Sequence, residues 1–405
     1  MKAVVFHGIG DIRIDDVPEP RLEEPSDAVV RLTSSAICGT DLHFIRGTFT
    51  GMKPGTILGH EGVGVVEQIG PMVRNLDAGD RVVIPSTIAC GTCAYCRAGY
   101  YAQCDRANPT GRGTAFFGGP EAAGGFAGLQ AERARVPFAN VGLVKLPPEI
   151  DDDNAILLSD IFPTGYFGAD LAEITPGDTV AVFGAGPVGQ FAIASAKLMD
   201  AGRVFAVDRL PDRLAMARKQ GAECIDFEQE DPVMAIKELT GGIGVDRAID
   251  AVGVDAQHAH AGPAAKQAEA QAALFEQELH EIAPEQHPVN GNWIPGDAPS
   301  QALSWAVRAL AKAGTLAIVG VYPPQARVFP IGEAMNKNLT VNMGNCNHRR
   351  YIPHLVELTR AGVVTPADIL SKVEPLSGAI EAYKAFDKRE PGWLKVELRP
   401  LRLAA

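Results

Sequence analysis

Four cysteines are closely spaced in the stretch ACGTCAYCRAGYYAQC. Cys90, Cys93, Cys96 and Cys104 follow the pattern C-x2-C-x2-C-x7-C. Four thiolates can complete a tetrahedral zinc shell without an open position, which is the arrangement of a structural site. An iron–sulfur cluster is the alternative, but the bacterial cluster motif has a three-residue final gap followed by proline, and this stretch has neither. The spacing therefore predicts a structural zinc lobe at about residues 89–105.

Two other short motifs bring together side chains that can bind a metal or move a proton. The hexapeptide CGTDLH begins at Cys38, includes Thr40 and ends at His43, and the stretch ILGHEGVGVV supplies His60 and Glu61. Either motif alone is compatible with an ordinary polar turn. A catalytic zinc needs three protein ligands and an open fourth position, and Cys38 and His60 would provide two of the three.

A glycine-rich turn predicts a dinucleotide site. The motif GAGPVG follows the strand-like run TVAVF and precedes a helical pattern, so Gly184 can make the tight turn, Gly186 can approach a pyrophosphate and Gly189 can pack closely against the strand. Asp208 ends the next strand, where a carboxylate can accept hydrogen bonds from the adenosine ribose and repel a 2′-phosphate. This favours NAD over NADP, although the neighbouring Arg209 weakens the preference. A doubly wound domain without nucleotide is the alternative.

The order of the expected elements divides the chain. Residues 1 to about 150 carry short β-type runs separated by Pro and Gly, typical of an irregular β-rich domain. From about residue 165, strands alternate with helices, which predicts an α/β fold with a doubly wound parallel sheet. After about residue 345, a helix and a final strand leave that rhythm, so the last segment is expected to return to the first domain.

An insertion interrupts the second domain. About fifty residues separate AVG at 251–253 from ALAKAG at 309–314, which we expect to be a helix, whereas such a connection normally takes about 2–6 residues. The Ala, Glu and Gln content predicts a helix around 264–282. A role in covering the cofactor competes with a role as a surface or subunit-contact feature. The histidines of the insertion suggest either a metal site or a solvated loop, and they are His258, His260, His280 and His287.

Composition excludes several classes of protein. The chain has 405 residues and a formal net charge of −12, which is not the basic character of a nucleic-acid-binding protein. The N-terminus lacks the apolar core of a signal peptide, and no apolar run reaches membrane-spanning length. We therefore expect a cytoplasmic protein with reduced cysteines and neither a nucleic-acid nor a membrane partner.

The combination of CGTD, GHEGVGVV, the four-cysteine lobe and GAGPVG, in that order and at these intervals, resembles the zinc-dependent medium-chain alcohol dehydrogenases. The resemblance implies a GroES-like β-rich catalytic domain around a Rossmann domain, two zinc ions per chain, NAD, and a dimer or tetramer of identical subunits. The implied domains are a catalytic domain over 1–158, a nucleotide-binding domain over 159–345 with an insertion at 254–300, and a return segment over 346–405.

The resemblance also implies roles for the residues of the two short motifs. Cys38 and His60 are similar to the family's catalytic zinc ligands. Thr40 corresponds to the hydroxyl that takes the substrate proton, and His43 to the imidazole that passes it onward through the cofactor ribose. Glu61 corresponds to an acid beside the metal.

The stretch SDIFPTGY departs from the commonest family pattern. Many relatives have a cysteine where this chain has Asp160, while Thr164 keeps the hydroxyl that faces the nicotinamide. A third ligand of this kind resembles the glutathione-independent formaldehyde dehydrogenase and formaldehyde dismutase branch, as does the insertion. An oxygen donor would leave zinc a stronger Lewis acid than sulfur does. The alternative interpretation is that Asp160 only caps a helix. Asp41, in the first short motif, is interpreted separately as a turn-capping residue.

Further contacts with the cofactor are implied by the same resemblance. Arg213 corresponds to a cation near the adenosine ribose, Lys395 to a cation at the pyrophosphate, and the strand end around Gly320 to the part that holds the carboxamide. The full set of implied cofactor residues is Gly39, Thr40, His43, Thr164, Gly184, Gly186, Pro187, Val188, Gly189, Asp208, Arg213, Val252, Val319, Val321, Gly344 and Lys395.

These expectations lead to one function and two alternatives. The first is reversible hydride transfer between NAD and a primary alcohol or small aldehyde, including an aldehyde hydrate. The second is dismutation of aldehydes by an enzyme whose NAD does not exchange. The third, from another class, is a non-catalytic protein that binds zinc and nucleotide.

Overall fold

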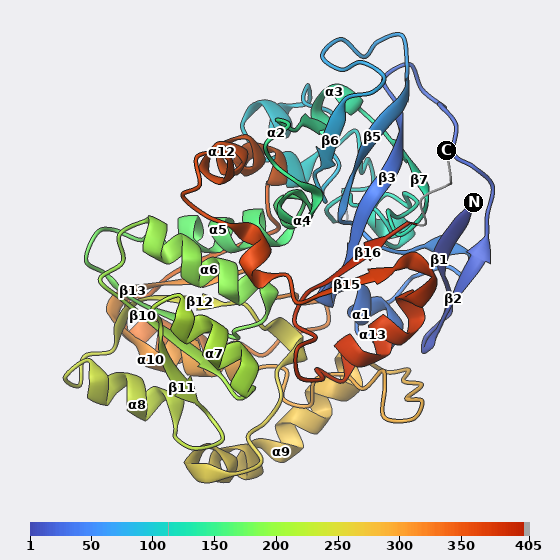
Figure 1. Ribbon diagram of the computed structural model, residues 1–405. Helices are drawn as coiled ribbons and strands as arrows, with labels where there is room; N and C mark the ends of the chain where they lie inside the picture. The colour runs from blue at the N-terminus through green and yellow to red at the C-terminus, as the bar shows by residue number, and fades with distance from the viewer. Residues whose placement is uncertain (112, 401–405) are drawn as a thin grey trace. The chain divides into compact units, whose positions relative to one another are not determined.

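The computed structural model describes residues 1–111 and 113–400. The chain forms two compact units, and each unit collects segments that are distant in the sequence (Figure 1). Unit 1 comprises Met1–Pro163, Glu285–Ile294 and Asn345–Ala405, and unit 2 comprises Thr164–Pro284 and Pro295–Gly344.

Unit 1 is built on β-sheets. A seven-stranded sheet has the order β15-β16-β3-β5-β6-β8, with β7 also paired to β3, and a three-stranded sheet has the order β2-β1-β4. Because β16 pairs with β3, the end of the chain returns to a sheet that begins near its start. The strands are β1 (Lys2–Gly8), β2 (Asp11–Asp16), β3 (Ala28–Ile37), β4 (Thr56–Ile57), β5 (Gly62–Ile69), β6 (Arg81–Ile84), β7 (Arg133–Val136), β8 (Val144–Lys145), β15 (Lys372–Pro375) and β16 (Val396–Arg399).

Short helices join these strands and carry several of the polar motifs. The α-helices are α1 (Gly39–Arg46), α2 (Ala94–Arg97), α3 (Ala139–Gly142), α4 (Asp152–Ala155), α12 (His348–Arg360) and α13 (Ala379–Asp387). The 3-10 turns are η1 (Tyr101–Gln103), η2 (Glu121–Ala123), η3 (Ile156–Leu158), η5 (Pro366–Ile369) and η6 (Leu376–Gly378). Helix α5 (Ile161–Leu171) carries the chain from unit 1 into unit 2.

Unit 2 contains a six-stranded sheet whose paired strands are all parallel. Its order is β11-β10-β9-β12-β13-β14, which in chain order is the 3-2-1-4-5-6 arrangement of a doubly wound dinucleotide-binding fold. This confirms the predicted α/β class. The strands are β9 (Thr179–Phe183), β10 (Arg203–Asp208), β11 (Glu223–Asp226), β12 (Val245–Asp250), β13 (Leu310–Ile318) and β14 (Thr340–Met343).

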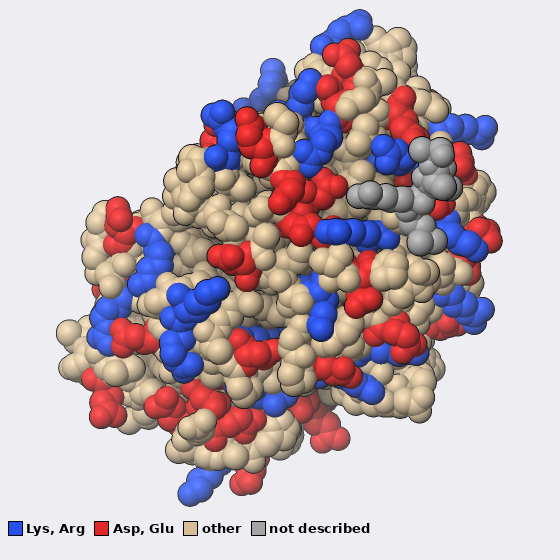
Figure 2. Space-filling view, viewed as in Figure 1, with Lys and Arg blue, Asp and Glu red and all other residues tan. Residues whose placement is uncertain are grey.

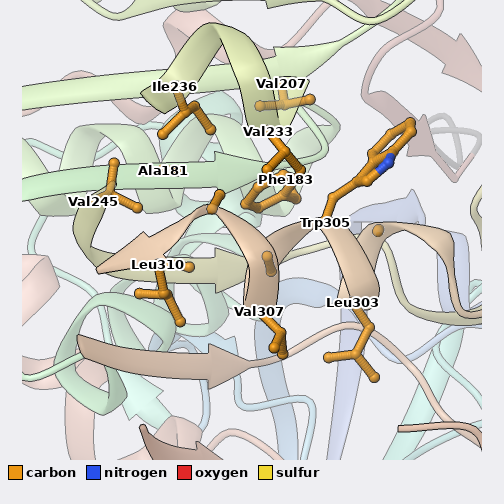
Figure 3. Packing of buried hydrophobic residues seen from close by; sticks show 14 of the residues in the cluster. Ala181, Phe183, Val207, Val233, Ile236, Val245, Leu303, Trp305, Val307 and Leu310 are labelled. Atoms are coloured by element: carbon orange, nitrogen blue, oxygen red, sulfur yellow. The ribbon is translucent and has the colours of Figure 1, made fainter. Parts of the chain in front are cut away.

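Helices cover both faces of this sheet, because successive strand residues point to opposite sides. Phe183 and Val207 pack against α8 and α10, as Figure 3 shows, whereas Val182 and Ala206 pack in a separate cluster with α5 and α6. The helices are α6 (Pro187–Leu198), α7 (Pro211–Lys219), α8 (Pro232–Leu239), α9 (Gly262–Ile282), α10 (Gln301–Ala309) and α11 (Ile331–Asn336), with the 3-10 turn η4 (Gly253–Asp255).

The insertion agrees with the sequence prediction in part. Its long helix α9 covers the predicted range 264–282. The predicted helix over 309–314 is wrong, because α10 ends at Ala309 and β13 begins at Leu310. Ala and Lys favour helix locally, but Leu310 pairs with Val245 of β12, and this segment runs directly into the part of β13 that pairs with β12 and β14. The stretch Glu285–Ile294 belongs to unit 1, an excursion that the sequence analysis did not anticipate.

The molecular surface carries charges of both signs. Acidic and basic side chains are interspersed on the face shown in Figure 2, and the formal net charge of the sequence is −12. Within residues 1–111 and 113–400, no helix has the length and apolarity needed to cross a lipid bilayer.

Candidate functional site

Four potential metal ligands converge in unit 1 from separate parts of the chain. Cys38 lies between β3 and α1, His60 and Glu61 directly precede β5, and Asp160 directly precedes α5. One donor atom from each lies within 4.8 Å of the others, and all four residues are buried. The structure therefore brings together the three predicted ligands, Cys38, His60 and Asp160, with Glu61 beside them.

The donor atoms are close enough to share one ion. The Sγ of Cys38 lies 3.6 Å from Oδ2 of Asp160, and Nε2 of His60 lies 3.2 Å from the same oxygen. Burial raises the pKa of the Cys38 thiol. Burial also opposes ionisation of Asp160, but the hydrogen bonds and charges of His348 and His60 hold the pKa of its carboxyl well below the ordinary value. Sulfur, nitrogen and oxygen donors in a buried cluster fit Zn²⁺, which accepts all three.

A buried chain of polar groups contacts Oδ1 of Asp160, the carboxylate oxygen that faces neither Cys38 nor His60 in the distances given above. Its Oδ1 lies 2.7 Å from Nε2 of His348, and Nδ1 of that imidazole lies 3.1 Å from Oγ1 of Thr87. His348 is 3% exposed, so the imidazole is held in place by protein contacts. His348 and Thr87 were not predicted from the sequence, because neither lies in a motif and His348 is 188 positions from Asp160.

A second network supports the other two predicted ligands. Oδ2 of Asp41 accepts hydrogen bonds from the backbone N–H of Cys38 at 3.0 Å and from Nε2 of Gln130 at 3.3 Å. Oδ1 of Asp41 lies 3.2 Å from Nδ1 of His60, although the two atoms are not aligned as a hydrogen bond. Burial opposes protonation of His60, but the charges of Asp41 and Cys38 raise its pKa well above the ordinary value. Asp41 thus caps the turn, as predicted, and also places a negative charge beside His60.

Glu61 forms a buried ion pair. Nζ of Lys395 lies 2.6 and 2.7 Å from the two carboxylate oxygens and donates to the carbonyl of Ile37 at 3.0 Å. Burial raises the pKa of Glu61 to about 7, against the opposing charge of Lys395. Lys395 is itself fully buried. These three hydrogen bonds of the Lys395 ammonium group all go to residues of unit 1. The predicted contact of Lys395 with a pyrophosphate is not tested by them and stays a prediction.

The predicted proton-relay residues lie on α1. Nδ1 of His43 is 2.7 Å from Oγ1 of Thr48, which fixes the imidazole in a buried position. Thr40 and Gly39 are half-buried in the first turn of the same helix. The partner Thr48 was not identified from the sequence, although it lies only five residues after His43.

The four-cysteine lobe forms a second cluster of potential metal ligands in unit 1. One donor atom from each cysteine lies within 4.8 Å of the others. Backbone N–H groups of Thr92 and Cys93 each donate to Sγ of Cys90 at 3.3 Å. Burial opposes ionisation of Cys90, but these hydrogen bonds and that of the Thr92 side chain lower its pKa to about 6. A sulfur surrounded by N–H donors is suited to the thiolate form that zinc requires.

The glycine-rich turn of unit 2 has the geometry of a nucleotide-binding loop. Gly184 has a φ of +88°, which a side chain would strain, and a Cβ on Gly189 would lie 1.8 Å from the carbonyl oxygen of Gly184. Asp208 is buried, and its Oδ2 accepts from the backbone N–H of Ala185 at 2.8 Å. Nη1 of Arg213 lies 3.7 Å from the same carboxylate oxygen.

The remaining predicted cofactor residues of unit 2 lie at element ends. Val252, Val319 and Gly344 follow the carboxyl ends of β12, β13 and β14, where doubly wound folds bind their ligands. The others are Thr164 in α5, Pro187 and Val188 at the start of α6, and Val321 beyond β13.

Comparison with known proteins agrees with this arrangement. Residues 24–148 match the alcohol dehydrogenase GroES-like domain, and residues 187–266 match the zinc-binding dehydrogenase family. A zinc-type alcohol dehydrogenase-like protein of Bacillus subtilis is 38% identical over 404 residues, 99% of this chain and 100% of the relative. The glutathione-independent formaldehyde dehydrogenase of Pseudomonas aeruginosa is 36% identical over 403 residues, 96% of each chain.

A solved structure gives the same result. The alcohol dehydrogenase TADH from Thermus sp. ATN1 matches with a TM-score of 0.80 and 36% identity, over 99% of this chain and 100% of that chain. The chain therefore belongs to the zinc-dependent medium-chain alcohol dehydrogenase family and is an oxidoreductase. Membership in an enzyme family rules out the non-catalytic alternative that the sequence analysis left open.

Proposed function

We propose that this enzyme transfers hydride between NAD and a primary alcohol or small aldehyde, including an aldehyde hydrate. The observation that carries the proposal is the buried convergence of Cys38, His60 and Asp160, with the His348 imidazole behind the carboxylate. The resemblance to formaldehyde dehydrogenases at Asp160 supports a small aldehyde as substrate. NAD is preferred in this proposal, since a 2′-phosphate would lie near the carboxylate of Asp208.

In the proposed mechanism, side chains of the protein bind the substrate and move its proton, while zinc and NAD supply the Lewis acid and the hydride acceptor. Zinc, when bound by Cys38, His60 and Asp160, polarises the substrate oxygen as a Lewis acid, and NAD, when bound, accepts the hydride. The hydroxyl of Thr40 accepts the proton of the substrate, and the imidazole of His43 is a later member of the same proton relay. Because Thr48 holds Nδ1 of His43, the orientation of the ring is fixed before substrate arrives.

The insertion supports a second candidate, a dismutase-like enzyme that retains its NAD. The guanidinium of Arg209, which follows Asp208, donates to Oε1 of Gln257 in the segment before α9. Nε2 of Gln301 in turn donates to the carbonyl of Gln257 at 2.8 Å. The start of the insertion is thus linked to the residue that follows the carboxylate predicted to bind the adenosine ribose, and the residue just after the insertion is linked to that start. A covered adenosine would slow release of NAD more than its capture.

Two measurements distinguish the two candidates. A panel of primary alcohols and aldehydes is assayed with and without added NAD, and the cofactor content of the purified enzyme is measured by absorbance and mass spectrometry after denaturation. Turnover that requires added NAD supports the dehydrogenase, and turnover of an aldehyde to alcohol and acid without it supports the dismutase. Absence of turnover with every compound under both conditions would refute both.

The proposed metal content is two zinc ions per chain. Elemental analysis of the Cys38→Ala variant is expected to show about one zinc in a folded, inactive protein. The Cys93→Ala variant is expected to have a lower melting temperature, because a closed zinc site contributes free energy of folding. One zinc per chain in the unmodified enzyme would contradict this assignment.

The remaining parts of the proposal follow from the resemblance. The enzyme is proposed to act in the cytoplasm as a dimer or tetramer. Sedimentation of the purified protein measures the number of subunits directly.

A further inference from the structure

A third group of potential metal ligands lies in unit 2, at the two ends of the insertion. His258 and His260 precede α9, and Asp297 follows it. One donor atom from each of the three lies within 4.8 Å of the others. The separation between His258 and Asp297 is 39 positions, so the cluster is formed by the fold and not by local sequence alone.

The two imidazoles are already arranged side by side. Their ring centroids are 4.6 Å apart, at an interplanar angle of 38°. The two histidines are separated by one residue, and alternate residues of an extended segment face the same side. The space they share is open to solvent, since the side chains of His258, His260 and Asp297 are 38%, 55% and 41% exposed.

Carboxylates hold both rings in place. Nδ1 of His258 lies 2.9 Å from Oδ2 of Asp297, and Nδ1 of His260 lies 3.0 Å from Oε1 of Glu228. The backbone N–H of His260 also donates to Glu228 at 2.9 Å. Glu228, which accepts from Nδ1 of His260, orients that imidazole and leaves its Nε2 as a ligand atom, a usual surrounding of a metal-bound histidine. Asp297 has the other role, since an ion held by its carboxylate and by Nδ1 of His258 would take the place of the contact between them.

The distances are compatible with one ion after small movements. Ligands at about 2.1 Å from a tetrahedral ion are about 3.4 Å apart. The donor atoms are within 4.8 Å of one another, so shifts of about 1 Å in partly exposed side chains are enough. Two imidazoles and a carboxylate suit a borderline divalent ion such as Zn²⁺ better than Ca²⁺ or Mg²⁺, which prefer oxygen ligands only.

We propose that His258, His260 and Asp297 bind a divalent transition-metal ion, with Zn²⁺ as the reference ion, and that Glu228 orients His260. The ion joins the segment before α9 to the segment after it and so closes the insertion into a loop. Closing a loop of this length restricts the unfolded chain, which stabilises the folded insertion. The proposal does not depend on the reaction that the enzyme catalyses.

Zinc binding is tested by calorimetric titration of the untagged enzyme whose cysteine-containing sites are already filled with zinc. The wild-type enzyme is expected to bind one further equivalent of Zn²⁺, and the His258→Ala/His260→Ala variant is expected to lose that equivalent. The His280→Ala variant is the matched control, because His280 is an exposed histidine of α9 outside the cluster. Equal stoichiometry in the wild-type enzyme and the double variant would overturn the proposal.

A second measurement uses only the wild-type enzyme, so it does not depend on the folding of a variant. Diethyl pyrocarbonate modifies accessible imidazoles, and peptide mass spectrometry locates the modified residues. Added Zn²⁺ is expected to protect His258 and His260 and to leave His280 reactive. If Zn²⁺ does not change the extent of modification of His258 and His260, the proposed site is refuted.

Discussion

The imidazole of His348 shows how a single residue outside every motif can complete a site. It connects Asp160 to Thr87, and it lies at the first position of α12. Outer partners of metal ligands fix the orientation of the ligand and affect its affinity for the ion. Among the three predicted ligands, the carboxylate of Asp160 departs from the commonest family pattern. It has a well-defined outer partner in His348.

Replacing His348 is therefore expected to weaken zinc binding at the Cys38 site. The His348→Ala variant should bind the catalytic zinc about 10–100-fold more weakly, because loss of an outer partner has that effect on metal affinity. The measurement is competition with a chromophoric chelator followed by elemental analysis. His354→Ala, an exposed histidine on the same helix, is the control. Equal zinc affinity in the two variants would show that His348 does not position the carboxylate.

Cofactor preference is also decided by one side chain in our proposal. In the Asp208→Asn variant the charge is lost, while an oxygen that can accept from the backbone N–H of Ala185 remains. The ratio of kcat/KM with NADP to that with NAD should rise about tenfold, equivalent to about 1.4 kcal/mol. Steady-state kinetics with both cofactors provide the test, and Asp212→Asn, on the exposed side of α7, is the control. A wild-type enzyme that already prefers NADP would contradict the role of Asp208.

Among the elements, the sequence predicted those with a strong local signal. The strand, glycine turn and helix around GAGPVG were predicted and are present as β9 and α6. Helix α9 was predicted from composition alone. The stretch at 309–314 was wrongly predicted as a helix, since Ala and Lys favour helix locally and only pairing with a neighbouring strand makes it part of β13. Pairing of this kind is a property of distant residues and has no local signal.

The excursion of Glu285–Ile294 is held by one carboxylate of α13. Oδ2 of Asp387 accepts from the backbone N–H of Trp293 at 2.7 Å and from Nδ2 of Asn292 at 3.1 Å, and Oδ1 accepts from Nε of Arg46 at 2.8 Å. Both side chains of the Arg46–Asp387 pair are 2% exposed. This segment of the insertion is therefore fixed by a buried charge that the sequence analysis did not identify.

Removal of that carboxylate should destabilise the protein strongly. Asp387→Ala removes the carboxylate that neutralises the buried guanidinium of Arg46, which is expected to lower the free energy of unfolding by about 3–5 kcal/mol. Urea denaturation measures the change. Glu357→Ala, which breaks an exposed ion pair with Arg360, should cost less than about 1 kcal/mol. A similar small loss in both variants would contradict the importance assigned to Asp387.

At the scale of the whole molecule, stability is expected to fall in acid. Burial raises the pKa of Asp178, but its hydrogen bonds to Thr175 and Arg247 outweigh burial and lower it. Because the folded-state pKa is below the unfolded value of about 3.9, this carboxylate stabilises the fold above that pH, and the contribution is lost as pH falls through the folded-state pKa.

The Asp178→Asn variant tests this expectation. It should be less stable than the wild-type enzyme by about 1–3 kcal/mol at pH 7, because hydrogen bonds to a charged group are lost. The difference should narrow when pH falls below about 4, where the wild-type carboxylate becomes protonated. Urea denaturation across this pH range measures both values, with the exposed Glu230→Gln as control. A difference that is independent of pH would refute the assignment.

The overall plan of the molecule was more predictable than its internal contacts. Three of the four donors around the Cys38 site occur in motifs, and the parallel sheet has a repeating pattern of strands and helices. The counter-charge of Glu61 is different, since Lys395 lies 334 positions away. The resemblance implies a contact of Lys395 with a pyrophosphate, and only the folded structure places its ammonium group against the carboxylate of Glu61.

That distance has a consequence for the order in which the two units can be completed during synthesis. The sheet of unit 1 needs β16 beside β3, and Glu61 needs Lys395, so both must wait for nearly the whole chain. At roughly 5–20 residues per second, the 334 positions between Glu61 and Lys395 take about 20–70 s to translate. The parallel sheet of unit 2 has all its strands once Met343 is made. The unit that starts the chain is therefore the last to finish on the ribosome.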